Sequence, residues 1–167
     1  MSQTEHKARA PRSVRCFVVT VSDTRTDATD TSGRAIADLL TAAGHVVAGR
    51  AIVPDTADLV RETLERQLAS TDVQAIITTG GTGITSRDST YEVVTGLMQK
   101  RLDGFGELFR MLSFEEIGAA AMMTRAAAGT IARKAVFVLP GSEHAVRLAM
   151  TRLILPELGH IVQQLDK

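Results

Sequence analysis

The sequence has little of the chemistry on which several classes of protein depend. Its single cysteine, Cys16, lies in an apolar segment, which excludes an internal disulfide and predicts a reducing, cytoplasmic environment. Its four histidines show no metal-ligand spacing, so we expect no structural zinc. The 19 basic and 19 acidic residues give a net charge of zero, so we expect no binding of nucleic acid.

Long apolar runs are also missing. Hydrophobic residues form 44% of the 167-residue chain, but charges interrupt them throughout, which excludes a membrane span. Residues 1–14 are polar, and we expect a flexible N-terminal tail without a secretory signal. Residues 15–167 are long enough to bury an ordinary core, and no repeat or linker divides them, so we expect one domain.

Apolar runs and helical periodicities alternate along this domain. Strands are expected at 15–21, 45–53, 75–79 and 135–139. Helices are expected at about 31–43, 56–70, 89–100, 107–128, 143–155 and 156–165. Thr31 or Ser32 would cap the first helix, Ser89 and Glu92 fit a capping box, and Gly104-Phe105-Gly106 would break the chain before residue 107. This alternation predicts a three-layer α/β/α sandwich with a mainly parallel sheet.

The loop after the third predicted strand is rich in glycine and hydroxyl side chains. It contains Thr79, Gly80, Gly81, Thr82 and Gly83. Glycines let backbone N–H groups approach an anion closely, and the threonines add hydroxyl donors. The loop matches neither a Walker A motif nor a dinucleotide GxGxxG motif. A plain strand-to-helix turn is the alternative, but one glycine would be enough for such a turn.

Charged side chains follow this loop directly. Arg87 supplies a fixed positive charge, and Asp88 supplies a carboxylate that could hold a metal or position a nucleophile. Arg87 would contact a phosphate or form an exposed ion pair. Asp88 could instead cap the next helix, although the capping box would leave it free. We therefore predict a phosphate-handling loop.

Two other predicted strands end in similar residues. The first strand ends in Ser22 and Asp23, and the last ends in Pro140-Gly141-Ser142. Parallel neighbours in a sheet open their carboxyl ends on the same edge. The three loops should therefore line one pocket of hydroxyls, backbone amides and carboxylates. Ser142 could also cap the helix that follows it, a role compatible with anion binding.

Taken in order, these motifs resemble the molybdopterin-binding family, which includes molybdopterin adenylyltransferases and the G domain of gephyrin. The resemblance rests on the glycine loop with Arg87-Asp88, on Gly104-Phe105-Gly106-Glu107 and on Leu139-Pro140-Gly141-Ser142. The run 109–118, which contains Ser113, is especially similar to the bacterial molybdenum cofactor biosynthesis protein B branch. The resemblance extends from Arg15 to the C-terminus and implies the same α/β sandwich.

The resemblance also implies a reaction, in which AMP passes from ATP to the terminal phosphate of molybdopterin with Mg²⁺ and pyrophosphate is released. Asp88 and Asp55 would be the catalytic and metal-binding carboxylates. The substrates would contact Ser22, Asp23, Thr79, Gly80, Gly81, Thr82, Gly83, Arg87, Ser113, Gly141 and Ser142. Asp55 has an ordinary alternative as a helix N-cap, and Asp23 has one in a local turn.

The resemblance leaves three functions open: an adenylyltransferase, a non-catalytic molybdopterin carrier and, from related domains, a nucleotide pyrophosphatase. It implies a trimer or hexamer, and the apolar stretch 105–128 exceeds the needs of one exposed helix, as an interface would. Molybdopterin, ATP and other enzymes of the cofactor pathway are the expected partners.

Overall fold

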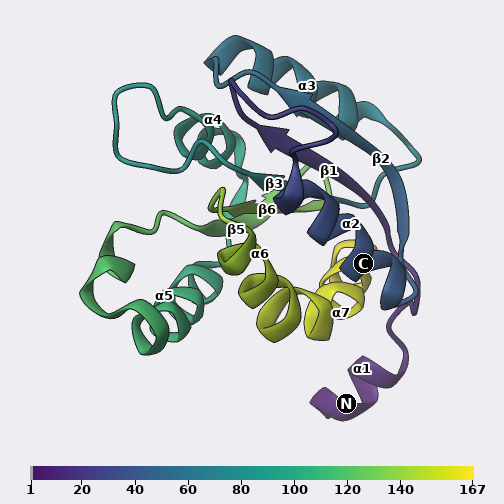
Figure 1. Ribbon diagram of the computed structural model, residues 1–167. Coiled ribbons are helices and arrows are strands. Elements are labelled where there is room, and N and C mark those ends of the chain that lie inside the picture. Colours follow the sequence, from purple (N-terminus) through teal and green to yellow (C-terminus); the bar gives the residue numbers. More distant parts are fainter. Residues whose placement is uncertain (1) are drawn as a thin grey trace.

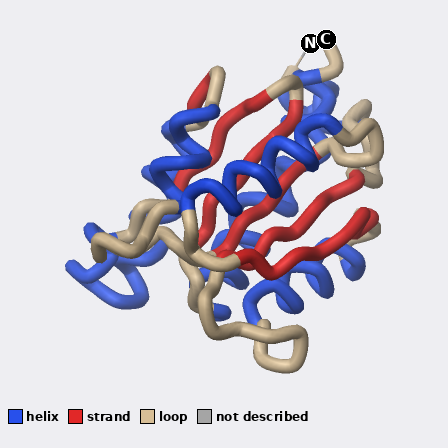
Figure 2. Tube along the Cα trace, turned by 90° about the horizontal axis from the view of Figure 1, so that it is seen from above, coloured by secondary structure: helices blue, strands red, loops and turns tan. Residues whose placement is uncertain are grey.

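A twisted sheet forms the centre of the computed structural model, which describes residues 2–167 (Figures 1 and 2). The strands are β1 (Arg15–Val21), β2 (Val46–Val53), β3 (Ala75–Thr79), β4 (Lys100–Arg101), β5 (Ala127–Ile131) and β6 (Lys134–Leu139). They lie in the order β2-β1-β3-β6-β5-β4. The pairs β2-β1, β1-β3 and β3-β6 are parallel, whereas β5 runs antiparallel to β6 and β4 antiparallel to β5. The mainly parallel sheet is thus confirmed.

Helices cover both faces of this sheet. On one face lie α2 (Thr31–Ala42), α5 (Asp103–Ile117), α6 (Glu143–Ala149) and α7 (Leu155–Leu165). On the other face lie α3 (Ala57–Ala69) and α4 (Thr90–Leu97), and the layers are visible in Figure 2. The three-layer α/β/α sandwich predicted from the sequence is therefore confirmed.

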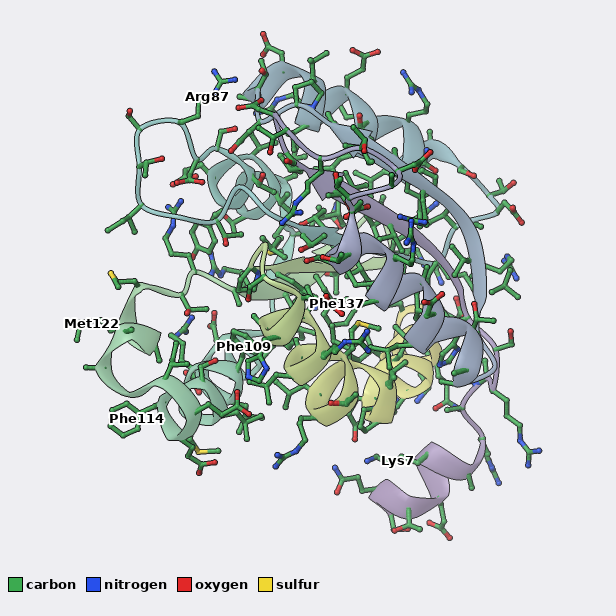
Figure 3. All side chains as sticks on the ribbon, viewed as in Figure 1. Lys7, Arg87, Phe109, Phe114, Met122 and Phe137 are labelled. Atoms are coloured by element: carbon green, nitrogen blue, oxygen red, sulfur yellow. The ribbon has the colours of Figure 1, made fainter. Side chains whose placement is uncertain are left out.

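The central strands are apolar throughout because both of their faces are buried. In β1, Val18 packs into the core beneath α2 and α6, while Val19 packs into the core beneath α3. Phe137 of β6 and Phe109 of α5 are both buried in the core beneath α2 and α6 (Figure 3). Continuous apolar runs are typical of parallel strands in this position. This burial holds the carboxyl ends of the strands in fixed register.

The polar segment 1–14 contains a short helix that the sequence did not predict. This helix, α1 (Gln3–Ala8), contacts α7, where Lys7 forms an ion pair with Glu157. Val14, at the end of the segment, is fully buried. No helix described in residues 2–167 has the length and apolar character that crossing a bilayer requires.

The helix predicted over 107–128 is wrong at both ends. It begins earlier, at Asp103, so that Gly104-Phe105-Gly106 lies inside α5. It ends at Ile117, because Gly118 has a left-handed φ of 70°. A 3₁₀ helix (Gly118–Met123) follows, and the chain then enters β5, which the sequence analysis did not predict.

Two of the predicted helix caps are also wrong. Asp30 caps α2, its Oδ1 accepting from the backbone N–H of Gly33 at 2.9 Å, in place of Thr31 or Ser32. Ser89 precedes α4 but makes no side-chain cap, because its hydroxyl donates to Asp55 at 2.9 Å. Contacts with residues distant in sequence replace the predicted capping box.

Candidate functional site

The glycine loop follows β3, in the middle of the sheet. Gly80 and Gly81 have φ values of 96° and 67°, in the left-handed region that favours glycine. A Cβ at Gly80 would lie 2.2 Å from the carbonyl oxygen of Val21, and one at Gly81 would lie 2.0 Å from Thr90 Oγ1. Dihedral angles and close packing both require glycine at these two positions, which the alternative of a plain strand-to-helix turn would also explain.

The loop presents a row of unused hydrogen-bond donors. The backbone N–H of Gly80 donates to the carbonyl of Leu139 at 3.1 Å. The next four N–H groups, of Gly81, Thr82, Gly83 and Ile84, donate to no group among residues 2–167. Successive free N–H groups of this kind form an anion-binding concavity. The loop therefore has donors that an anion could use, and anion binding at this loop stays a prediction.

The three strand ends meet at one cavity, as the sequence analysis predicted. A cavity of about 150 Å³ is lined by Ser22 from the end of β1, Thr79 and Gly80 from the end of β3, and Gly141 from the end of β6. It adjoins a larger cavity of about 500 Å³, which shares Ser22 and is also lined by Asp23. This edge of the sheet therefore has room for a small ligand.

Asp23, Asp55, Arg87 and Ser89 form a chain of polar contacts beside the loop. Asp23 Oδ1 accepts from the backbone N–H of Asp55 at 3.0 Å, and Asp23 Oδ2 accepts from Arg87 Nε at 3.0 Å. Asp55 Oδ1 in turn accepts from the Ser89 hydroxyl at 2.9 Å and faces Gly81. Asp55 therefore makes no helix cap, and it joins the ends of β1 and β2 to the loop.

The charge of Arg87 is matched by Asp23. Both side chains are exposed, and the Arg87 guanidinium lowers the pKa of Asp23 by hydrogen bonding, with a smaller contribution from the N–H of Asp55. Of the two sequence interpretations of Arg87, the structure contains the ion pair, and Figure 3 shows the side chain at the outer surface. Contact with a phosphate remains a prediction.

Asp88 lies at the far end of the same loop. Its Oδ2 accepts from the backbone N–H and the hydroxyl of Thr85, at 3.0 and 2.7 Å, and a Cβ at Gly83 would lie 2.5 Å from the same oxygen. Asp88 does not cap α4, whose N-cap residue is Ser89. The loop thus has one carboxylate beside Gly81 and another beside Gly83.

These two carboxylates could provide oxygen ligands to a metal. Within residues 2–167, no group of three or more His, Cys, Asp or Glu side chains is arranged to hold a metal ion. Asp55 Oδ2 and Asp88 Oδ1, however, accept no hydrogen bond from the described residues. A hard cation that keeps several waters and is completed by substrate oxygens would fit such a sparse, all-oxygen set.

Ser113 and Ser142 line a separate cavity of about 140 Å³, together with His144. Ser113 comes from α5 and is 5% exposed, whereas Ser142 caps α6 by accepting from the N–H of Ala145 at 3.2 Å. The cap predicted for Ser142 is confirmed. The structure brings these two predicted residues together, apart from the cavity at Gly80.

Several charged residues around the loop and its cavities were missed by the sequence analysis. Asp30 is 2% exposed and accepts from Thr20 Oγ1 at 2.8 Å and Arg50 Nη2 at 3.0 Å, beside the smaller cavity. Arg125 donates to the loop carbonyl of Thr82 at 2.9 Å. Asp30 before Thr31-Ser32-Gly33 was a detectable N-cap signal, but Arg125 lies 43 residues from its partner and had none.

Comparisons with known proteins agree with this architecture. A family model described as a probable molybdopterin binding domain matches residues 17–160. The chain is 53% identical over 168 residues to molybdenum cofactor biosynthesis protein B of Bacillus anthracis, covering 100% of this chain and 99% of the relative. A crystal structure of a molybdenum cofactor biosynthesis protein B has 52% identity and a TM-score of 0.91, covering 95% and 99% of the two chains.

A more distant solved structure shows the same fold. It is the tungsten cofactor synthesizing protein MoaB from Pyrococcus furiosus, with 38% identity, a TM-score of 0.84, and coverage of 95% of this chain and 100% of that chain. The range matched by the family model includes the glycine loop and all three strand ends that line the cavity.

Proposed function

The chain belongs to the probable molybdopterin binding domain family, and from this premise we propose that it acts in molybdenum cofactor biosynthesis as an adenylyltransferase. It would transfer AMP from ATP to the terminal phosphate of molybdopterin and release pyrophosphate. The loop Gly80–Gly83, with free N–H groups between Asp55 and Asp88, is the observation that carries this proposal.

The loop provides what a transfer between two anions needs. An oxygen of the molybdopterin phosphate forms a bond to the α-phosphorus of ATP, and the bond from that phosphorus to the bridging oxygen breaks, its electron pair leaving with pyrophosphate. Because both reactants are anions, the site must reduce their repulsion and hold them in line. The free N–H groups of the loop would bind phosphate oxygens, while the cavity of about 500 Å³ beside Asp23 has room for the nucleotide.

Mg²⁺ would be held by the free oxygens of Asp55 and Asp88 and would supply positive charge to the transferring phosphate. Asp55 is fixed for this role by its bonds from Ser89, at 2.9 Å from the hydroxyl and 3.3 Å from the N–H. Asp88 is fixed by Thr85. Each carboxylate therefore keeps one oxygen that no hydrogen bond occupies and that could bind a metal.

The direct test is to incubate the pure protein with molybdopterin, ATP and Mg²⁺. We expect adenylylated molybdopterin and pyrophosphate in equal amounts, with no pyrophosphate when molybdopterin is left out. The second condition separates a transferase from a nucleotide pyrophosphatase, which would consume ATP without the pterin. Wild-type protein that forms no product above background would refute the proposal.

A non-catalytic molybdopterin carrier is the second candidate. It is favoured by one observation: the guanidinium of Arg87 is already paired with Asp23, so its charge is not free to bind the phosphates of ATP. A carrier would bind molybdopterin tightly, show no turnover of ATP, and be insensitive to Mg²⁺. Titration calorimetry with molybdopterin, run beside the pyrophosphate assay, distinguishes the two functions.

The exposed face of α5 and the following 3₁₀ helix supports an oligomer, either a trimer or a hexamer. Phe114 and Met122 are 61% and 78% exposed, and both point away from the sheet in Figure 3. Met111, Ile117 and Met123 are also more than half exposed. Apolar patches of this kind mark interfaces. Light scattering should give a mass that is a multiple of 17.9 kDa, and Met122→Glu should lower it.

A further inference from the structure

Arg125 makes direct contact with the backbone of the glycine loop. It lies between the 3₁₀ helix and β5, far from the loop in sequence. Its Nε donates to the carbonyl oxygen of Thr82 at 2.9 Å, and its Nη2 donates to the carbonyl oxygen of Gly83. One guanidinium therefore holds two consecutive peptide groups.

The guanidinium is itself held on its other sides. Its Nη1 is paired with the carboxylate of Glu92, and its central carbon lies 4.9 Å from the centre of the Tyr91 ring. All three nitrogens of Arg125 thus have acceptors within the protein. Arg125 is 25% exposed at its side chain, which agrees with this enclosed position.

The direction of these bonds determines where the loop N–H groups point. In a trans peptide the C=O and the N–H of one peptide group point in opposite directions, and residues 2–167 contain no cis peptide bond. When Arg125 draws the carbonyls of Thr82 and Gly83 toward itself, the N–H groups of Gly83 and Ile84 must point away from it. Those two N–H groups are among the free donors of the loop.

We propose that Arg125 is a positioning residue that fixes the glycine loop in its anion-binding form, a role that rests on the proposed function of the loop. It keeps two carbonyl oxygens out of the anion site and turns two N–H groups toward it. Arg125 does not act through its charge, because Glu92 neutralises it. Loss of the residue should therefore weaken phosphate binding by releasing the peptide groups.

Arg101 provides a matched control. Its guanidinium lies on the same Tyr91 ring, at 5.9 Å from the ring centre, and bonds the Tyr91 hydroxyl at 3.1 Å, but it makes no contact with the loop. We expect Arg125→Met to weaken binding of inorganic pyrophosphate and of Mg²⁺-ATP by about 10- to 100-fold, as is typical when a residue orienting a binding group is lost. Arg101→Met should stay within about twofold of wild type. Arg125→Lys keeps a cationic donor but lacks the planar fork of the guanidinium, so it should recover part of the loss.

Glu92→Met shows whether Arg125 acts through its position or its charge, because the two roles predict opposite changes in the affinity for pyrophosphate. Removal of a negative charge beside an anion site would tighten pyrophosphate binding if electrostatic attraction were the role of this pair. If position is the role, Arg125 loses its support and binding should weaken. Tighter binding by Glu92→Met, or wild-type binding by Arg125→Met, would overturn the proposal.

A measurement without ligand separates this proposal from the proposed function. The order of the Gly83 and Ile84 amides, measured by ¹⁵N relaxation, should be lower in Arg125→Met than in Arg101→Met, with both variants kept well below their melting temperatures. If wild type makes no adenylylated product but Arg125→Met still shows lower amide order and weaker pyrophosphate binding, adenylylation is refuted and the role of Arg125 is supported. If wild type is active and Arg125→Met matches it in amide order and binding, Arg125 has no positioning role.

Discussion

Replacement of Gly80 by alanine tests whether the glycine loop is fixed by contact with β1. The backbone of Gly80 has a φ of 96°, and an added Cβ would lie 2.2 Å from the carbonyl oxygen of Val21. A left-handed conformation costs a non-glycine residue about 1–2 kcal/mol. The overlap with a backbone atom adds about 1–3 kcal/mol, as overpacking does elsewhere. We therefore expect Gly80→Ala to lower the free energy of unfolding by about 2–5 kcal/mol.

Gly44 is the control for the dihedral term alone. Its φ is 87°, similar to that of Gly80, but apart from Gly44 and its chain neighbours no atom lies within 4 Å of an added Cβ. Gly44→Ala should therefore cost only the left-handed term, about 1–2 kcal/mol. It lies after α2, away from the loop, so catalysis and phosphate binding should not change.

Denaturant unfolding of the three proteins, followed by circular dichroism, measures the difference. In a protein of this size each kcal/mol corresponds to about 2–4 °C in melting temperature, so thermal melts provide a second reading. Pyrophosphate binding should weaken in Gly80→Ala only, because the loop must move away from Val21. If both alanine variants lose the same stability, the contact with β1 does not constrain the loop and our reasoning is wrong.

Three further predictions concern other parts of the molecule. Asp88→Asn should reduce adenylylated product by about 10²–10³-fold, the usual loss of one positioned electrostatic group, while molybdopterin affinity and melting temperature stay close to wild type; normal turnover would remove Asp88 from catalysis. The β5–β6 hairpin turns through Ala132 and Arg133, whose φ values of 49° and 62° are those of a type I′ turn. Ala132→Asn with Arg133→Gly should raise the free energy of unfolding by about 1–2 kcal/mol, and an unchanged denaturation midpoint would contradict this. The pKa of Asp23 is lowered in the folded protein, so its contribution to stability is present above its unfolded pKa and disappears as the pH falls through its folded pKa. Arg87→Met should raise that pKa toward its ordinary value in an NMR titration of the carboxyl carbon, and no movement would show that the ion pair does not form in solution.

The parallel part of the sheet was predictable because burial on both faces leaves a plain signal. β1 and β3 read as short apolar runs rich in β-branched residues, and each is followed by residues typical of turns. The order of the strands was not predicted. Register and order depend on contacts between segments distant in sequence, such as Cys16 beside Ala75, which periodicity does not encode.

The antiparallel edge was missed for an identifiable reason. β5 has the sequence Ala127-Ala128-Gly129-Thr130-Ile131, whose small residues carry little strand preference, and β4 is only two residues long. Gly106 was misread in the opposite way: the sequence predicted that it would interrupt the chain before the helix, but it lies inside α5 and is required there. A Cβ there would lie 2.9 Å from the carbonyl oxygen of Ala126. Close packing, not chain flexibility, explains this glycine.

The site was predictable in its location but not in its contacts. Convergence of three strand ends follows from parallel topology, so the cavity at Ser22, Gly80 and Gly141 could be expected before the structure. The partners of the charged residues could not be predicted from the sequence. Asp23 and Arg87 are separated by 64 positions, and nothing in either local sequence indicates that they pair.

The charges around the loop explain how a protein without net charge could attract two anionic substrates. Arg87 is paired with Asp23, Arg50 with Asp30, and Arg125 with Glu92. Arg25, which lines both cavities, forms no ion pair among residues 2–167, but the carboxylates of Asp55 and Asp88 offset its charge. Side-chain charge therefore gives the site no net positive field. Attraction must come from the groups that the pairs leave free, which are Arg25, the backbone N–H groups from Gly81 to Ile84, and a cation brought by the nucleotide. Such an arrangement would bind phosphate at the loop donors and repel little elsewhere, as the proposed AMP transfer requires of a site that holds two phosphates and then releases pyrophosphate.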